Sequence, residues 1–456
     1  MGNGMSGSHD PFSVVILAAG QGTRMKSSLH KVLHPIAGRP MLEHLLHTVD
    51  QLGAERRVVV LGTGREQVEQ VLARHPVQIA IQADQLGTGH AVQQAEAALQ
   101  DFDGTVVILY GDTPFVAPET ISAMRARLEA ADKPGVVVLA SSPADPGAYG
   151  RVILGEGDRI AKMVEFKDAT ADERAVRLCN SGMMAVHKAD LFRWLAEVGN
   201  ANAAGEYYLP DIVMVAASEG RHAVVIEAEP WQTAGVNSRA ELAALEHDWQ
   251  QRRRAQALSG GATLIDPTTV WFSHDTQLGR DVLIEPNVFL GPGVQVADGA
   301  TIRSFSHLEG ASVGENAEVG PFARLRPGAV LERKAKVGNF VEVKKARLGE
   351  GAKANHLTYL GDADVGAGAN VGAGTITCNY DGFFKYKTVI GAGAFIGSNS
   401  ALVAPVTIGA GAIVGAGSVI TRDVESDTLG VTRAEQKSLG GWAARFRERQ
   451  SAKKRD

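Results

Sequence analysis

Cysteines and long apolar runs are scarce in this sequence. Cys179 and Cys378 are the only cysteines among 456 residues, and neither stands in a CxxC or Cys/His pattern. This pattern indicates neither a disulfide framework nor a zinc site, and it favours a reducing compartment, the cytoplasm. No apolar run approaches the roughly 18 residues of a membrane-spanning helix, and no secretory segment follows the start. Membrane insertion is therefore not expected.

Basic residues are not in excess either. The chain has 46 lysines and arginines, 51 aspartates and glutamates, and a formal net charge of -5. Because nucleic-acid-binding domains normally carry a basic face, no nucleic-acid partner is expected. The length predicts two or three domains. Glycine, by contrast, is abundant at 52 residues and clusters unevenly.

The segment 12–237 alternates short apolar runs with stretches of helix length. Ser13–Leu17, Arg57–Leu61 and Thr105–Leu109 are runs of the buried-strand type. Continuous apolar strands separated by helices predict a mostly parallel sheet covered on both faces. We therefore expect a Rossmann-like α/β domain over residues 12–237.

The segment 261–433 has a period of six. The spaced aliphatic residues form three runs, separated by slips: Leu278, Ile284, Leu290, Val296, Ile302 and Leu308; Val313, Val319, Leu325, Leu331, Val337 and Val343; Ile390, Ile396, Leu402, Ile408, Val414 and Ile420. A triangular coil needs this spacing, with one inward aliphatic residue per side and small residues at the corners. The pattern resembles the left-handed parallel β-helix of hexapeptide-repeat acyltransferases.

Three further segments complete the predicted organisation. Residues 1–11 are read as a disordered leader, and 434–456 as a tail that caps the coil, donates residues to a neighbouring subunit or frays into solvent. Strong helix formers over 238–260, closed by Gly260 and Gly261, predict a linker helix. Its arginines, Arg252–Arg254, are interpreted as a solvated face.

A glycine-containing loop directly follows the first predicted strand. The segment Leu17–Met25 reads Leu-Ala-Ala-Gly-Gln-Gly-Thr-Arg-Met, with Lys31 and Pro35 downstream. Its glycines let backbone N–H groups approach phosphates, and Arg24 adds positive charge. The GKS/T ending of a Walker loop and the third glycine of the dinucleotide fingerprint are both missing.

This loop resembles that of the sugar-nucleotide pyrophosphorylases. The segments Gln85–His90 and Tyr110–Pro114 match that family further. Together with the hexapeptide half, the likeness narrows to bifunctional N-acetylglucosamine-1-phosphate uridylyltransferase/glucosamine-1-phosphate acetyltransferases, from about Val14 to Arg433. One departure is His30, where relatives often have proline.

The resemblance implies a first site that transfers UMP from UTP to N-acetylglucosamine-1-phosphate. The implied nucleotide- and sugar-binding residues are Leu17, Ala18, Ala19, Gly20, Arg24, Lys31, Gln82, Gly87, Thr88, Tyr110, Gly111, Asp112, Gly150, Glu165, Asn180 and Asn237. Arg24 and Lys31 would act on the phosphates. Asp112 and Asn237 would hold Mg²⁺, a hard cation that prefers oxygen ligands.

Each of these residues also has an ordinary structural interpretation. Asp112 is a suitable turn residue before Pro114, and Asn237 could simply cap the following helix. Lys31 could be a surface lysine. Their joint occurrence in family order favours the functional interpretation.

The resemblance also implies an acetyl-transfer site with acetyl-CoA as co-substrate. His356, in the segment Asn355–Asp362, would be the general base, because histidine titrates near neutral pH. The other implied residues are Arg326, Lys344, Tyr359 and Asn370 for the sugar phosphate, Asn379 and Tyr380 for orientation, and Ala373, Asn379, Tyr380, Ser398, Ala416 and Arg433 for acetyl-CoA. Lys385 is a further polar residue in the segment that interrupts the repeat.

The product implied by this likeness is UDP-N-acetylglucosamine, a precursor for peptidoglycan and lipid A. A homotrimer assembled through the β-helix is implied as well. One alternative is a single-activity sugar-1-phosphate nucleotidyltransferase whose β-helix only supports oligomerisation. A polar cluster such as His356, Asn379 and Tyr380 disfavours it, because an assembly module does not need one. A non-catalytic sensor is disfavoured by the presence of Lys31, Asp112 and Asn237.

Overall fold

The computed structural model describes residues 11–454, and the contacts between residues divide the chain into two compact units after Gln251. The predicted leader, 1–11, lies outside the described residues except for its last position. Over 11–454, no helix is long and apolar enough to span a membrane.

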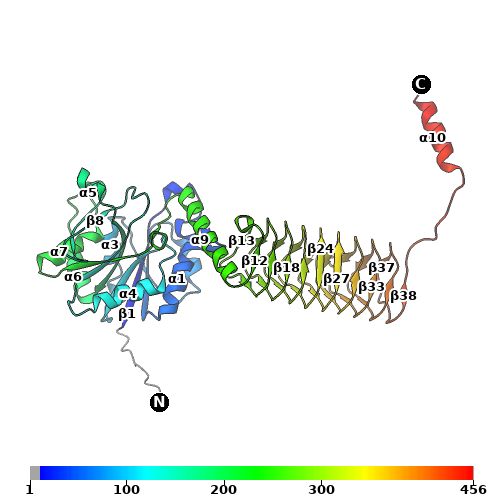
Figure 1. Cartoon of the computed structure of the whole chain (residues 1–456), viewed down its shortest axis with the longest axis horizontal. Helices are drawn as coiled ribbons and strands as arrows, with labels where there is room; N and C mark the ends of the chain where they lie inside the picture. The colour runs from blue at the N-terminus through cyan, green and yellow to red at the C-terminus, as the bar shows by residue number, and fades with distance from the viewer. Residues whose placement is uncertain (1–10, 455–456) are drawn as a thin grey trace, which may run out of the picture. The chain divides into compact units, whose positions relative to one another are not determined.

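The first unit is built on one mixed sheet (Figure 1). Its strand order is β11 (Ala223–Glu227), β7 (Val136–Ser141), β10 (Cys179–His187), β6 (Thr105–Tyr110), β1 (Phe12–Ala18), β4 (Arg56–Leu61) and β5 (Gln78–Ile81). The pairs β1–β4, β1–β6, β4–β5 and β7–β11 are parallel. Only β10 runs antiparallel to its neighbours in this path. The predicted parallel arrangement is confirmed for β1, β4, β5, β6, β7 and β11, whereas β10 and the two strands attached to it, β8 (Arg151–Leu154) and β9 (Ile160–Val164), make antiparallel pairs.

Short strands and helices complete this unit. The remaining strands are β2 (Pro35–Ile36), β3 (Arg39–Pro40), β8 (Arg151–Leu154) and β9 (Ile160–Val164). The α-helices are α1 (Met41–Leu52), α2 (Glu66–Leu72), α3 (Thr88–Gln93), α4 (Pro118–Leu128), α5 (Ala171–Ala175), α6 (Lys188–Glu197), α7 (Ile212–Ser218) and α8 (Pro230–Thr233). The 3₁₀ turns are η1 (Thr23–Met25), η2 (Lys31–Leu33), η3 (Ala97–Leu99) and η4 (Leu209–Asp211).

Both faces of the sheet are buried. Successive residues of β1 enter different apolar clusters: Val15 and Leu17 belong to one, Val14 and Ile16 to the other. All seven residues of β1 are buried, which explains the continuous apolar run in the sequence. The loop after β1 therefore starts from a rigid base.

Helix α9 (Arg239–Ser259) ends at the two glycines. The amide of Gly260 donates to the Gln256 carbonyl at 2.9 Å, and Gly261 has a φ of +96°. That backbone conformation favours glycine because it has no Cβ, so the chain can leave the helix there.

The interpretation of Arg252–Arg254 as a solvated face is wrong for two of its three residues. Arg254 is 3% exposed, and its Nε donates to the Val270 carbonyl at 2.9 Å. Arg253 donates to the Thr276 carbonyl at 2.8 Å and lies over the Phe272 ring. Both side chains pack against the first coil of the second unit, because guanidinium groups can satisfy backbone carbonyls while stacking on aromatic rings.

The second unit is a coil with three parallel faces (Figure 1). The first face is β12 (Thr263–Leu264), β15 (Leu283–Ile284), β18 (Thr301–Ile302), β21 (Glu318–Val319), β24 (Lys336–Asn339), β27 (Lys353–His356), β30 (Asn370–Val371), β33 (Phe395–Ile396), β36 (Ile413–Val414) and β38 (Leu429–Gly430). The second face is β13 (Trp271–Phe272), β16 (Phe289–Leu290), β19 (His307–Leu308), β22 (Arg324–Leu325), β25 (Glu342–Lys344), β28 (Tyr359–Gly361), β31 (Ile376–Cys378), β34 (Ala401–Val403) and β37 (Val419–Ile420). The third face is β14 (Gln277–Leu278), β17 (Gln295–Val296), β20 (Ala311–Val313), β23 (Ala329–Leu331), β26 (Arg347–Leu348), β29 (Ala363–Val365), β32 (Thr388–Ile390) and β35 (Val406–Ile408).

The six-spaced aliphatic residues form the interior of this coil. Ile284, Val319 and Ile396 are each 0% exposed, and of the three predicted runs only Leu278 is less than fully buried. A 3₁₀ turn, η5 (Pro267–Thr269), precedes the second face, and helix α10 (Trp442–Lys453) lies in the tail. The predicted fold class, an α/β nucleotidyltransferase unit followed by a left-handed parallel β-helix, is confirmed.

Candidate active sites

The glycine-containing loop after β1, here called the phosphate loop, packs tightly against Lys31. Gly22 has a φ of +66°, and a Cβ on it would lie 2.6 Å from the Lys31 Cβ. A side chain at this position would be strained and would displace the lysine. The loop glycine therefore fixes where the Lys31 side chain begins.

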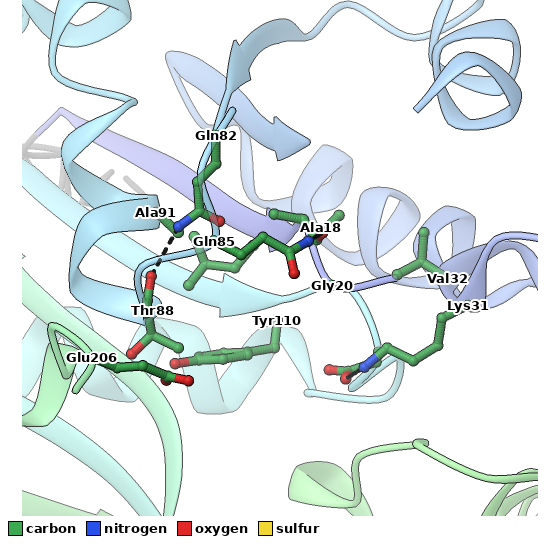
Figure 2. Close-up of a pocket in the computed structure, with 14 residues that line it drawn as sticks. Ala18, Gly20, Lys31, Val32, Gln82, Gln85, Thr88, Ala91, Tyr110 and Glu206 are labelled. Atoms are coloured by element: carbon green, nitrogen blue, oxygen red, sulfur yellow. Dashed lines mark hydrogen bonds and ion pairs between the residues drawn. The ribbon is translucent and has the colours of Figure 1, made fainter. Parts of the chain in front are cut away.

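A cavity of about 300 Å³ opens beside this loop (Figure 2). It is lined by Leu17, Ala18, Ala19, Gly20, Lys31, Val32, Gln82, Gln85, Gly87, Thr88, Ala91, Tyr110, Asp112 and Glu206. Figure 2 shows Lys31 towards one end of the cavity and Gln82 with Thr88 towards the other. The cavity thus combines one end that carries the Lys31–Asp112 ion pair with another lined by amide and hydroxyl groups and by Glu206.

Polar contacts fix the amide and hydroxyl end. Gln82 is 3% exposed, and its Nε2 donates to the Gly87 carbonyl at 3.0 Å. Thr88 Oγ1 accepts from the Leu209 amide at 3.0 Å. Burial raises the pKa of the Tyr110 phenol well above its usual value, so it stays neutral. The ring packs on Gly182, where a Cβ would lie 2.7 Å from it.

Lys31 contacts both predicted metal ligands. Its Nζ forms an ion pair with Asp112 Oδ2 and donates to Asn237 Oδ1 at 3.2 Å. A carboxylate oxygen and an amide oxygen therefore converge on one point that holds positive charge. This donor set fits Mg²⁺, which typically takes one or two protein oxygens and completes its shell with water and phosphate.

The structure places the other predicted residues of this site outside the cavity lining. Asn237 and Arg24 line a second cavity of about 540 Å³. Gly150, Glu165 and Asn180 lie together: the Asn180 amide donates to the Gly150 carbonyl at 2.9 Å, and a Cβ on Gly150 would lie 3.1 Å from Glu165 Oε1. Burial, followed by the charge of Asp211, raises the pKa of Glu165.

In the second unit, several predicted residues, beginning with the general base His356, lie in a column along one corner of the β-helix. Asn339 pairs with His356 across β24 and β27. The registers Ala354↔Val371, Val371↔Ile396 and Ile396↔Val414 place Ala373, Ser398 and Ala416 at the same position in the next three coils. His356 and three predicted acetyl-CoA residues therefore line up on the corner between the first and second faces. Arg433 joins this column by donating to the Ala416 carbonyl at 2.7 Å.

A side-chain contact orients His356. Its Nδ1 lies 2.8 Å from Asn339 Oδ1. An amide oxygen only accepts hydrogen bonds, so this assignment puts the imidazole proton on Nδ1 and leaves Nε2 available as a base.

Cationic residues gather at the next corner, between the second and third faces. Arg326 and Lys344 stand at equivalent positions in adjacent coils. Arg326 also forms an ion pair with Glu342, with 2.8 Å between its guanidinium nitrogen and the carboxylate oxygen. The charges of Arg326 and then Lys385 lower the pKa of the Lys344 ammonium. Three cations this close together make a suitable phosphate-binding surface.

The remaining predicted residues surround this second corner or lie on the first face. Gly361 pairs with Lys344 in register, and a Cβ on it would lie 2.4 Å from Tyr359 Oη and 2.7 Å from Asn379 Nδ2. Asn379 donates to Asp362 Oδ2 at 2.6 Å, whereas Tyr380 is 60% exposed. Asn370 lies on β30, away from both corners.

Comparison with known proteins identifies the family. The model of the MobA-like NTP transferase domain matches residues 14–259, and that of bacterial transferase hexapeptide repeats matches residues 387–422. The "Bifunctional protein GlmU" of Sphingopyxis alaskensis is 64% identical over 446 residues, covering 98% of both chains. This chain belongs to the GlmU family.

Other GlmU proteins match to a similar extent. That of Rhizorhabdus wittichii is 66% identical over 97% of this chain and 98% of its own length. That of Zymomonas mobilis is 58% identical over 98% of this chain and 99% of its own length. The likeness spans both units, so the resemblance seen in the sequence is confirmed for the whole chain.

Sequence reasoning missed several site residues within these two units. Gln85 donates to the Ala19 carbonyl at 2.7 Å and so holds the phosphate loop. It stands in the same short segment as Gly87 and Thr88, which was an available signal. Asp362 likewise ends the segment that carries His356, whereas Glu206 and Asn339 reach the sites only through the fold, and nothing in their local sequence marks them.

Proposed function

We propose that this chain makes UDP-N-acetylglucosamine in two reactions. The β-helix transfers an acetyl group from acetyl-CoA to glucosamine-1-phosphate, and the first unit then transfers UMP from UTP to the N-acetylglucosamine-1-phosphate formed. The observation that carries this proposal is the presence of two chemically different constellations, one in each unit of a GlmU-family chain. The single-activity alternative leaves His356, Asn339 and the cations of the second corner without a role.

The uridylyl transfer is an in-line displacement at phosphorus. A phosphate oxygen of the sugar phosphate attacks the α-phosphorus of UTP, the bond to the β-phosphate oxygen breaks, and pyrophosphate leaves. Gln82 and Thr88 hold the uridine end, while Lys31 lies where the phosphates bind. Mg²⁺ held by Asp112 and Asn237 would neutralise triphosphate charge. The protein's own contribution is positioning and charge stabilisation.

The acetyl transfer needs a base and an anion-binding surface. The sugar amine attacks the thioester carbonyl, the carbon–sulfur bond breaks, and coenzyme A leaves as its thiol. His356 Nε2 accepts the amine proton and returns it to the departing sulfur. Arg326 and Lys344 bind the sugar phosphate, and Asn379 and Tyr380 orient the reacting groups. The column of Ala373, Ser398 and Ala416 offers small residues along which acetyl-CoA can lie.

The proposal includes a homotrimer assembled through the β-helix. Phe305, Phe322 and Phe340 stack in successive coils, with ring centroids 4.9 and 5.3 Å apart. All three have positive φ, which bulky residues rarely adopt, and they remain 46–56% exposed. With Leu357, which continues the row beside His356, they form what we call the aromatic ridge. An exposed apolar row of this kind is typical of an interaction surface, and a second copy of this chain is the proposed occupant.

The proposed setting is the cytoplasm, where the product supplies peptidoglycan and lipid A precursor synthesis. Both cysteines are free thiols, which fits a reducing compartment.

A coupled assay tests the function directly. The full chain is incubated with glucosamine-1-phosphate, acetyl-CoA, UTP and Mg²⁺, and free thiol and pyrophosphate are followed separately. We expect both products, with pyrophosphate depending on prior acetylation. Pyrophosphate formation without thiol release would favour the single-activity alternative.

A further inference from the structure

Gln67 bonds to the loop that leads into Lys31, although it does not line the nucleotide cavity. Its Oε1 accepts from the His30 amide at 3.0 Å, and its Nε2 donates to the Ser28 carbonyl at 3.0 Å. One side chain therefore holds the backbone on both sides of Leu29. Because both ends of the amide are used, the loop is fixed in position and direction.

The two partners of this clamp belong to well-anchored elements. Gln67 stands at the start of α2, whose Val68 and Leu72 are 0% and 2% exposed. On the other side, His30 is 8% exposed, and its carbonyl accepts from the Leu33 amide at 3.0 Å to close η2. The clamp thus ties the turn that carries Lys31 to a helix of the core.

We infer that Gln67 is a positioning residue for Lys31 in uridylyl transfer. The backbone of Lys31 follows directly after the clamped segment, while Gly22 packs on its Cβ and Asp112 and Asn237 hold its Nζ. Those contacts act on the side chain of Lys31, whereas Gln67 holds the backbone that leads into it. The inference rests on the proposed function of the first unit.

The clamp depends on the residue before Lys31. The backbone of His30 has φ and ψ of -59° and 141°, values that a proline also adopts. Proline has no N–H, so it would keep the backbone conformation but remove the bond to Gln67. His30 therefore permits a contact that proline at this position cannot make.

The test compares Gln67→Ala with Gln70→Ala, an exposed glutamine on the same helix. Misplacing a catalytic group from a distance can cost up to about a hundredfold, and we expect Gln67→Ala to lower kcat/KM for UTP about tenfold. Gln70→Ala should match the wild type. Acetyl transfer, measured on the same preparations, should be unchanged. Gln67→Glu keeps the acceptor for His30 but loses the donor to Ser28, so its loss should be smaller.

A double-mutant cycle separates positioning from a merely structural role. If Gln67 acts through Lys31, Gln67→Ala should cause no further loss in a Lys31→Ala background, measured with radiolabelled UTP. Equal losses in both backgrounds, or equal activity of Gln67→Ala and Gln70→Ala, would overturn the inference. Failure of the proposed function is distinguishable, because the wild-type chain would then release no pyrophosphate at all.

Discussion

Most predicted residues of the first unit line one cavity, whereas those of the second unit lie along two corners of a β-helix. In the first unit, Gln82 is 3% exposed and its amide is held by the surrounding loop. In the second, Tyr380 is 60% exposed, and His356 and Lys344 occupy different corners. An α/β sheet gathers its loops at the strand ends, where they can close over a small molecule. A solenoid offers only its surface, so its site needs a further surface to enclose the substrate.

The largest effect is expected at His356. A positioned general base contributes roughly a hundred- to ten-thousand-fold, so His356→Ala should lower acetyl transfer by that range. Uridylyl transfer to pre-acetylated sugar phosphate should be nearly unchanged, because His356 belongs to the second unit only. Thiol release and pyrophosphate release are measured on one preparation. Acetyl transfer within a few-fold of the wild type would remove His356 as the base.

The reciprocal variant is Asp112→Ala in the first unit. Losing a group that stabilises developing charge costs about a hundred- to a thousandfold, so pyrophosphate release should fall by at least that range. Raising the Mg²⁺ concentration should recover part of the loss, while thiol release stays normal. If Asp112→Ala lowers both activities equally with the fold intact, the two sites are not independent.

A variant of the aromatic ridge tests the need for a further surface. Aspartate tolerates positive φ better than phenylalanine, so Phe322→Asp should leave each chain folded but disrupt the proposed trimer. Acetyl transfer should fall about tenfold more than uridylyl transfer if the second site depends on its neighbour. Val330→Asp, on the third face and 39% exposed, is the matched control. Sedimentation that shows Phe322→Asp and Val330→Asp at the wild-type size would rule out the ridge as the interface.

The smallest expected effect concerns acid stability of the first unit. Burial, with the charges of Lys31 and His34, lowers the pKa of His30 below 6.5. A lowered histidine pKa means that the folded state holds the neutral form, so stability is lost as the pH falls below 6.5. His30→Asn should therefore reduce the drop in Tm between pH 7 and pH 5 by about 2 °C. Calorimetry with His47→Asn, an exposed histidine, provides the control; an equal drop in both variants would contradict this assignment.

The β-helix could be predicted in detail because its rule is local. Each coil requires one aliphatic residue per side. The spacing alone therefore predicts that residues such as Ile284 and Val319 are buried. The strand β10 shows the limit of such prediction, because the sequence of Cys179–His187 does not indicate whether the neighbouring strands run parallel to it. Its direction depends on which strands it joins across the fold.

The residues of the candidate sites also differ in how far the sequence predicts them. Residues in contiguous motifs, such as Gly20 and Thr88, could be assigned from sequence and do line the cavity. Asn339 and Gln67 could not, because an isolated amide has no motif and acts only through a contact distant in sequence. Arg254 was misread for a related reason: charge favours exposure on average, yet its guanidinium meets the Val270 carbonyl at 2.9 Å.

The most direct test of the central claim mixes the two inactive variants. Asp112→Ala and His356→Ala are each supplied with glucosamine-1-phosphate, acetyl-CoA, UTP and Mg²⁺, separately and together, and UDP-N-acetylglucosamine is quantified. If each unit holds one complete reaction, neither variant alone makes appreciable product, whereas the mixture does, because the acetylated sugar phosphate passes from one protein to the other. A mixture that makes no more product than the separate variants would contradict the assignment of one reaction to each unit.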